Sequence, residues 1–214
     1  MSDSYRTIEG DATATLKVDG SRFIAEAIPV SDRTAVENGL QLVRDREHKA
    51  THHCSAYRLG RDGHDFHYDD DGEPSGTAGQ PILRQIDGRD LTNTLVVVTR
   101  YFGGTKLGTG GLVRAYGDAA DAALDQAAIV ERIVRTPVRV RFDYDDTAAA
   151  RQLIQRFDVS IQESDYTDVT EWTVGVRASE VDAFVEAFTD ALAARGTVVR
   201  VGNGAREGGA GEGA

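Results

Sequence analysis

Residues 101–114 read YFGGTKLGTGGLVR, and the segments on either side of this glycine-rich stretch indicate how the first half of the chain folds. The apolar run 95–98 precedes it, and a short run rich in β-branched residues predicts a buried strand. The segment that follows is rich in Ala and Leu, and its aspartates are spaced to lie on one face of a helix. The glycine-rich stretch therefore connects a strand at 95–100 to a helix at 111–130.

This connection has the composition of an anion-binding loop. Glycine tolerates positive φ and close approach by another molecule, and glycines before a helix N-terminus leave N–H groups free to meet an anion. No acidic residue occurs between Leu91 and Gly117. We predict an anion-binding site formed by Arg100, Tyr101, Gly103, Gly104, Lys106, Gly108, Gly110, Gly111 and Arg114.

The loop does not match two common phosphate-binding motifs. No Gly-Lys-Ser/Thr follows four spacer residues after a glycine, as a P-loop requires. Gly108 and Gly110 could begin a dinucleotide fingerprint, but Val113 stands where its third glycine should be. A tight turn without any ligand remains an alternative explanation of the glycines.

Composition sets the class of protein. With 214 residues, of which 40% are hydrophobic, the chain can form two modest domains or one large one. It has no apolar stretch near the roughly 20 residues of a membrane span and no apolar signal region, so we expect a cytoplasmic protein without a membrane partner. Cys54, the one cysteine, excludes an internal disulfide or a thiolate zinc cluster from this chain alone. We predict that Cys54 is a small buried side chain, and a reactive thiol is the alternative.

The net charge of −11 is spread along the chain, and lysine occurs only at Lys17, Lys49 and Lys106. An acidic, lysine-poor surface suits high salt, because screening removes the self-repulsion that such a charge would otherwise cause. We therefore expect a salt-adapted, haloarchaeal protein. In such a protein the negative background does not argue against a nucleic-acid partner, and local exceptions to it are informative.

The remainder of the first half alternates strands and helices. Runs 12–18 and 22–28, joined by Asp19-Gly20, predict a β-hairpin, whereas the residues up to Gly10 are expected to form a loose start. The further predicted elements are a helix at 32–47, strands at 52–59 and 64–68, a polar loop at 69–76 and a helix at 77–86.

After a boundary near 133–136, the second half predicts a strand, a helix, two strands, a helix and a strand. This βαββαβ order is the ferredoxin-like split motif. The Gly-rich residues 203–214 have no apolar side chain beyond alanine and are expected to form a disordered tail. The predicted elements are strands at 137–142, 159–164, 168–177 and 197–201 and helices at 147–157 and 180–194.

Histidines and carboxylates offer weaker candidates for chemistry. His52 and His53 are adjacent in a predicted strand and point to opposite faces, so they cannot both reach one metal ion. A site built from His52 and the acidic loop remains conceivable, but we predict no metal and no cofactor. The acidic loop fails as a calcium loop, because Ala78 stands where the bidentate glutamate should be. We expect it to be solvated, or to form a cleft rim of Asp70, Asp71 and Glu73 beside the glycine-rich loop.

Four blocks of sequence resemble the IMPACT/YigZ family. In chain order they read SRFIA (21–25), THHCSAY (51–57), DDGEPSGTAG (70–79) and RYFGGTKLG (100–108). The second half is similar to the last domain of elongation factor G, which prokaryotic YigZ-type members carry. The resemblance implies an α+β protein with an IMPACT-type domain at 1–134 of the left-handed βαβ kind shared with a ribosomal protein, then a ferredoxin-like domain at 135–202.

The resemblance also implies a link to translation. Eukaryotic relatives regulate a stress kinase by competing for its activator protein, but we expect this protein to lack their additional N-terminal domain, so that partner does not transfer directly. The family supplies no catalytic mechanism to carry over. We therefore expect a non-enzymatic binding protein that contacts RNA or the ribosome through the basic loop, with Tyr101 or Phe102 available to stack on bases.

Two alternatives remain open. One is an enzyme that acts on a small phosphorylated or nucleotide ligand, with His52 and Glu73 as acid–base groups and Lys106 holding the anion. For this reading His52 and Glu73 must lie within reach of one point near the loop. The other is a regulator whose protein partner, for example in the translation stress response, meets the ferredoxin-like sheet.

Overall fold

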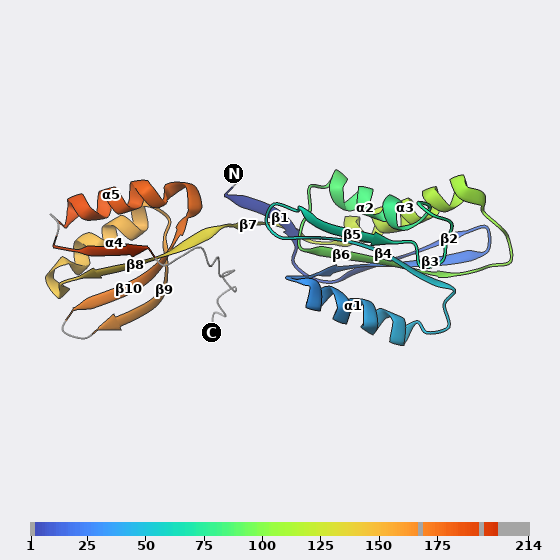
Figure 1. Ribbon diagram of the computed structural model, residues 1–214, viewed down its shortest axis with the longest axis horizontal. Helices are drawn as coiled ribbons and strands as arrows, with labels where there is room; N and C mark the ends of the chain where they lie inside the picture. Colours follow the sequence, from blue (N-terminus) through green and yellow to red (C-terminus); the bar gives the residue numbers. More distant parts are fainter. Residues whose placement is uncertain (1–2, 167–168, 193–194, 201–214) are drawn as a thin grey trace. The chain divides into compact units, whose positions relative to one another are not determined.

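The computed structural model describes residues 3–166, 169–192 and 195–200 (Figure 1). The chain divides into two compact units. One comprises Tyr5–Arg132, and the other comprises the residues from Ile133 onward together with the start of the chain up to Ser4. The expected α+β fold with an N-terminal and a C-terminal domain is confirmed. The predicted tail at 203–214 lies outside the described residues.

The first unit is built on a five-stranded antiparallel sheet in the order β2-β3-β6-β4-β5. Helix α1 packs on one face, and α2 and α3 pack on the other (Figure 1). Strands β1 and β7 form a separate two-stranded sheet. The bounds are β1 Ser4–Ile8, β2 Ala12–Val18, β3 Ser21–Pro29, α1 Arg33–Arg46, β4 His52–Leu59, β5 Asp65–Asp69, α2 Gly79–Gly88, β6 Thr94–Tyr101, α3 Gly108–Gln126 and β7 Ile129–Ile133.

The position of β6 explains why its sequence is apolar throughout and does not alternate between apolar and polar residues. Val96 and Val98 belong to the core beneath α2 and α3, whereas Leu95 and Val97 belong to the core beneath α1. A central strand that is covered on both faces buries every side chain, so its sequence has no polar face. The helix after it begins at Gly108, three residues earlier than predicted.

The expectation of a loose N-terminus is wrong, because β1 forms a strand that pairs with β7. This pairing joins segments about 120 residues apart in sequence, and a five-residue strand shows no local signal of such a partner.

The second unit has a four-stranded antiparallel sheet in the order β11-β8-β10-β9. Its first strand lies between the fourth and the third, which is the ferredoxin-like arrangement. Side chains of both helices join one core with Trp172 and Phe142, so the helices share one face of the sheet. The bounds are β8 Arg135–Phe142, α4 Thr147–Arg156, β9 Ser160–Tyr166, β10 Thr170–Arg177, α5 Val181–Ala191 and β11 Thr197–Arg200, with short 3-10 turns at Tyr144–Asp146 and Ala178–Glu180.

Candidate functional site

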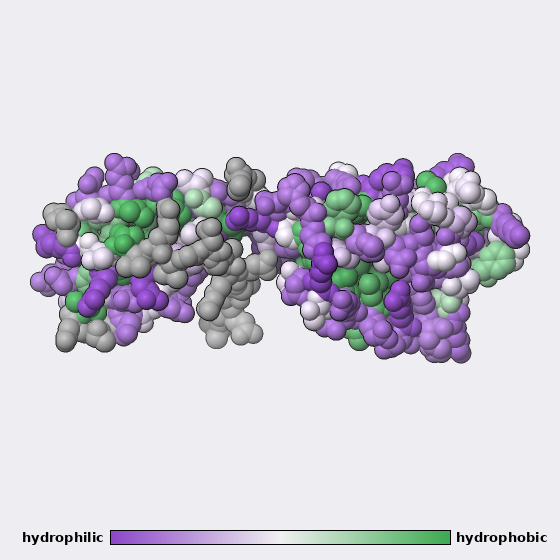
Figure 2. Space-filling model, viewed as in Figure 1, coloured by the Kyte–Doolittle hydropathy of each residue, from purple (hydrophilic) through white to green (hydrophobic). Residues whose placement is uncertain are grey.

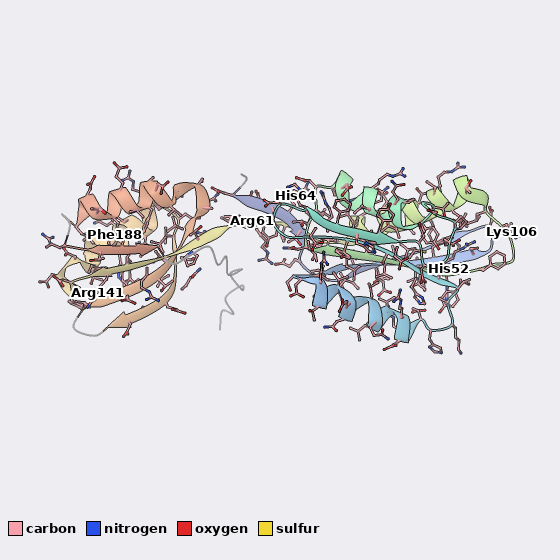
Figure 3. All side chains as sticks on the ribbon, viewed as in Figure 1. His52, Arg61, His64, Lys106, Arg141 and Phe188 are labelled. Carbon is pink, nitrogen blue, oxygen red and sulfur yellow. The ribbon has the colours of Figure 1, made fainter. Side chains whose placement is uncertain are left out.

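The predicted site residues gather at one end of the five-stranded sheet. Strand pairing aligns Arg22 with Tyr101 and His52 with Arg100, so β3, β6 and β4 meet there. Figure 3 shows His52 and Lys106 at this end, while Arg61 and His64 lie at the opposite end of the same unit. Four connections therefore come together, namely the β2–β3 turn, the α1–β4 connection, the β5–α2 loop and the glycine-rich β6–α3 loop.

Close backbone packing accounts for part of the glycine content. A Cβ on Gly103 would lie 1.9 Å from the carbonyl carbon of Gly20, and Gly104 and Gly108 have φ of +94° and +69°. These three positions require glycine whether or not a ligand binds. At Gly110, however, φ is not positive and a Cβ would meet nothing within 4 Å. A tight turn alone therefore does not explain Gly110.

The basic side chains of the loop face solvent. Lys106 and Arg114 are exposed, and within the described part of the chain neither forms an ion pair or a hydrogen bond. Helix α3 begins beside them with no side-chain cap and no acidic residue in its first turn. The N–H groups at a helix N-terminus carry partial positive charge. Phe102 is 48% exposed in the same loop, and Figure 2 shows hydrophobic residues (green) among hydrophilic ones (purple) at this end of the unit.

Arg100 is instead a buried structural group. Its Nη1 donates to Glu73 Oε1 at 2.5 Å, and the two side chains are only 6% and 4% exposed. The Tyr116 hydroxyl donates to the same oxygen at 2.7 Å, and Arg100 Nη2 donates to Ser21 Oγ at 3.4 Å. This cluster ties the β5–α2 loop to β6, α3 and β3. Glu73, expected on a cleft rim, is thus inside the domain, because it neutralises a buried arginine.

His52 lies at the margin of this cluster. Its Nδ1 is 2.7 Å from the carbonyl oxygen of Asp71, which can only accept, so Nδ1 carries the hydrogen. Nε2, which bears the lone pair when the ring is neutral, lies 3.9 Å from Glu73 Oε1. The two acid–base candidates are therefore close together, although Arg100 and Tyr116 already occupy that oxygen of Glu73.

Two other acidic residues of the β5–α2 loop bind backbone N–H groups, Asp70 within the loop and Asp71 in β4. Asp70 accepts hydrogen bonds from the backbone N–H groups of Gly76, Ala78 and Gly79 at 2.7–2.9 Å. Asp71 accepts the N–H of His53 at 2.6 Å. These two carboxylates, which were expected to be solvated, hold the loop to itself and to β4, which explains why a polar, Gly-rich segment takes one defined course.

Cys54 is fully buried, as predicted, and its thiol donates to the carbonyl oxygen of Asp70 at 3.1 Å. Burial raises the pKa of this thiol, so little thiolate forms and the alternative of a reactive cysteine is not supported. No group of three or more His, Cys, Asp or Glu side chains in the described ranges is placed to hold a metal ion.

Tyr101 is held from both sides. Its hydroxyl donates to Glu47 Oε2 at 2.8 Å, and the Arg22 guanidinium lies 4.4 Å from its ring centroid. The hydrogen bond from Tyr101 lowers the pKa of the Glu47 carboxyl. Of the two aromatic residues proposed for base stacking, Phe102 is thus the more accessible.

Known proteins resemble the chain over nearly its whole length. The Impact N-terminal domain model matches residues 19–124, and a domain family of unknown function, DUF1949, matches residues 140–195. IMPACT family member YvyE of Bacillus subtilis is 36% identical over 89% of this chain and 88% of its own. IMPACT family member YigZ of Escherichia coli is 33% identical over 88% of this chain and 93% of its own. The chain belongs to the IMPACT family.

A solved structure supports the same fold for the IMPACT chain described here. A crystal structure of a hypothetical protein superposes with a TM-score of 0.69 at 30% identity, and the match covers 95% of this chain and 100% of the other. Among the described residues, no helix combines the length and the apolar character that crossing a membrane requires.

The four blocks that carry the family resemblance are brought together by the buried cluster. Ser21, His52, Glu73 and Arg100 come one from each block, and they meet around the Glu73 carboxylate. The blocks thus build one end of the IMPACT domain. Two exposed lysines at this end, Lys17 and Lys49, were not predicted as site residues. Their rarity was visible in the sequence, but their position beside the loop depends on the strand order.

Proposed function

We propose that this IMPACT protein is a non-enzymatic binding protein of translation or its control, and that it contacts RNA through the glycine-rich loop at 102–111. The observation that carries the proposal is the pair Lys106 and Arg114. Both are exposed and have no counter-charge in the described structure, in a protein whose net charge is −11. Phosphate contacts supply most of the sequence-independent affinity of proteins for nucleic acid.

The neighbouring groups divide into two classes. Arg100 and Glu73 neutralise each other inside the domain and are positioning residues for the loop. Lys106, Arg114 and the first-turn amides of α3 are available to phosphates, and Phe102 is available to a base. An exposed aromatic beside exposed cations is typical of surfaces that bind unpaired RNA.

Sedimentation with ribosomes tests the proposal. The tagged full-length protein is mixed with lysate at the salt of its native host, and bound RNA is identified by crosslinking and sequencing. Replacing both Lys106 and Arg114 with alanine should weaken association and make log K less steep against log salt, by roughly 0.7–0.9 per lost phosphate contact. Replacing Arg61, at the opposite end of the unit (Figure 3), and Arg84, an exposed residue of α2, removes the same charge outside the loop and serves as the control. Association that is identical in wild type and loop variant would refute the proposal.

A second candidate function rests on the 3.9 Å separation of His52 Nε2 and Glu73 Oε1. If a nucleotide or phosphorylated metabolite binds at the loop, the His52 lone pair is the group able to accept a proton. Thermal-shift screening of such compounds comes first, followed by turnover assays with wild type and His52→Gln. Equal turnover in wild type and His52→Gln would exclude His52 as the base.

The sedimentation experiment also bears on the protein-interaction alternative. A protein partner recovered there instead of RNA would favour a role of the ferredoxin-like sheet in binding that partner.

A further inference from the structure

The three lysines of the chain all lie at one end of the first unit. They come from three separate segments, namely Lys17 at the end of β2, Lys49 before β4 and Lys106 after β6. Lys17 is opposite Arg22, and Arg22 is opposite Tyr101, so β2 and the glycine-rich loop share this end. The N–H of Thr51 donates to the Arg100 carbonyl at 2.8 Å, which places the segment that carries Lys49 beside β6.

These lysines carry no internal role in the described structure. Lys17, Lys49 and Lys106 are exposed, and none forms an ion pair or hydrogen bond among the described residues. In contrast, many arginines of the chain form an ion pair with a carboxylate. They include Arg33, Arg46, Arg58, Arg89, Arg100, Arg135 and Arg195. A lysine is a flexible, strongly hydrated point charge suited to phosphate.

The charge at this end is polarised across the sheet. Four basic residues lie on β2, β3, the glycine-rich loop and the first turns of α3, namely Lys17, Arg22, Lys106 and Arg114, and Asp19 in the β2–β3 turn is the acidic residue among them. The opposite side, at the end of β5, carries the acidic loop that begins at Asp69. Lys49 lies at the border, next to the central strands. A polyanion is attracted to the basic side of this end and repelled by the acidic side, so the charge pattern determines where a polyanion can bind.

We infer that a single strand of RNA runs along this basic edge, with its phosphates at Lys17, Arg22, Lys106 and Arg114, one base on Phe102, and Lys49 flanking the path. The inference rests on the proposed function and extends it from one loop to a path over three segments. An unpaired strand is specified because an exposed ring needs a base face that a duplex keeps stacked. The acidic side gives the path one border.

Variants that each remove one charge test whether RNA follows the proposed path. We would follow binding of a fluorescein-labelled oligouridine of about 12 nucleotides, within the usual site sizes for single-strand binders, by anisotropy over a series of salt concentrations. Lys17→Gln and Lys49→Gln each remove one charge at this end. Arg61→Gln removes one charge at the opposite end of the unit. We expect the slope of log K against log salt to become shallower by about 0.7 in Lys17→Gln, by less in Lys49→Gln because Lys49 only flanks the path, and to stay unchanged in Arg61→Gln.

The possible results separate the path from the proposed function. If wild type does not bind the oligouridine at any salt concentration, the path is refuted, and the ribosome sedimentation decides the proposed function separately. If wild type binds and the Lys106/Arg114 variant is weakened, but Lys17→Gln and Lys49→Gln match Arg61→Gln, the loop contacts RNA and the path is wrong. If all three single variants lose the same affinity, only net charge matters and the path is also wrong.

Phe102 tests the requirement for an unpaired strand. Phe102→Ala should weaken binding on the order of tenfold while leaving the salt slope unchanged, because stacking releases no counterions. A duplex of equal length should compete poorly with the single strand. Equal competition by the duplex, or an unchanged affinity of Phe102→Ala, would overturn the single-strand assignment.

Discussion

Replacing Glu73 with glutamine should destabilise the first unit by about 3–5 kcal/mol, because it leaves the charge of Arg100 buried without its partner. The two side chains are 4% and 6% exposed, so water cannot replace the lost carboxylate. The Tyr116 hydroxyl also loses a charged acceptor, although the glutamine carbonyl can still accept. For a unit of this size, such a loss lowers the melting temperature by roughly 10–20 °C.

The chain contains an internal control for the location of the effect. Trp172, the one tryptophan, is buried in β10 of the second unit, so its fluorescence follows the unfolding of that unit. Urea unfolding monitored by circular dichroism should shift in Glu73→Gln, while the tryptophan transition should stay in place. Asp118→Asn, at an exposed residue of α3, makes the same change of charge without a buried partner and should cost less than about 0.5 kcal/mol.

A double variant distinguishes a broken ion pair from a packing defect. Glu73→Gln with Arg100→Met removes both charges, so no buried arginine is left without its partner, and the glutamine carbonyl can still accept from Tyr116. The double variant should therefore be more stable than Glu73→Gln alone. If Glu73→Gln costs less than about 1 kcal/mol, or if the double variant is the less stable of the two, the buried pair does not hold the loop.

Three further outcomes are expected. Gly103→Ala should destabilise by at least about 1–3 kcal/mol in urea unfolding, because its methyl would overlap the Gly20 backbone, whereas Gly110→Ala should be neutral or stabilising. Cys54 should resist iodoacetamide at pH 8 until the protein is unfolded, since burial raises its pKa, and rapid native labelling would contradict this. Tyr101→Phe should raise the lowered pKa of Glu47 in an NMR titration. The folded-state pKa of Glu47 lies below its unfolded value, so the ionised carboxylate stabilises the folded protein at pH 7. Tyr101→Phe should therefore be less stable than wild type at pH 7, and this difference should vanish as pH falls through the folded pKa of Glu47.

Local sequence was sufficient for most of the elements. A buried central strand, a hairpin turn at Asp19-Gly20 and the βαββαβ order each depend on neighbouring residues, and all three occur. The start of α3 was misplaced because glycine disfavours helix, yet Gly110 and Gly111 do not have the positive φ of a loop. Strand β1 was missed because its partner lies at the far end of the domain.

The sequence located the site region but not the role of each residue in it. Arg100 and Lys106 are both cations beside glycines, and nothing local distinguishes one from the other. Burial separates them: Arg100 has Glu73 for a partner from a segment 27 residues earlier, and Lys106 has none in the described structure. Lys17 and Lys49 were missed as site residues for the same reason, since only the strand order brings them beside the loop.

The buried and exposed cations at this end are suited to complementary tasks. Arg100 has a planar, weakly hydrated group with several donors, and it bridges Glu73 and Ser21 from different segments. The loop that it anchors also donates from Gly103 to Ser21 at 3.2 Å and from Phe102 to Thr51 at 3.3 Å, so its course is set before any ligand arrives. A loop ordered in advance loses little conformational entropy on binding. The exposed lysines can then remain flexible, because the position of the surface does not depend on them.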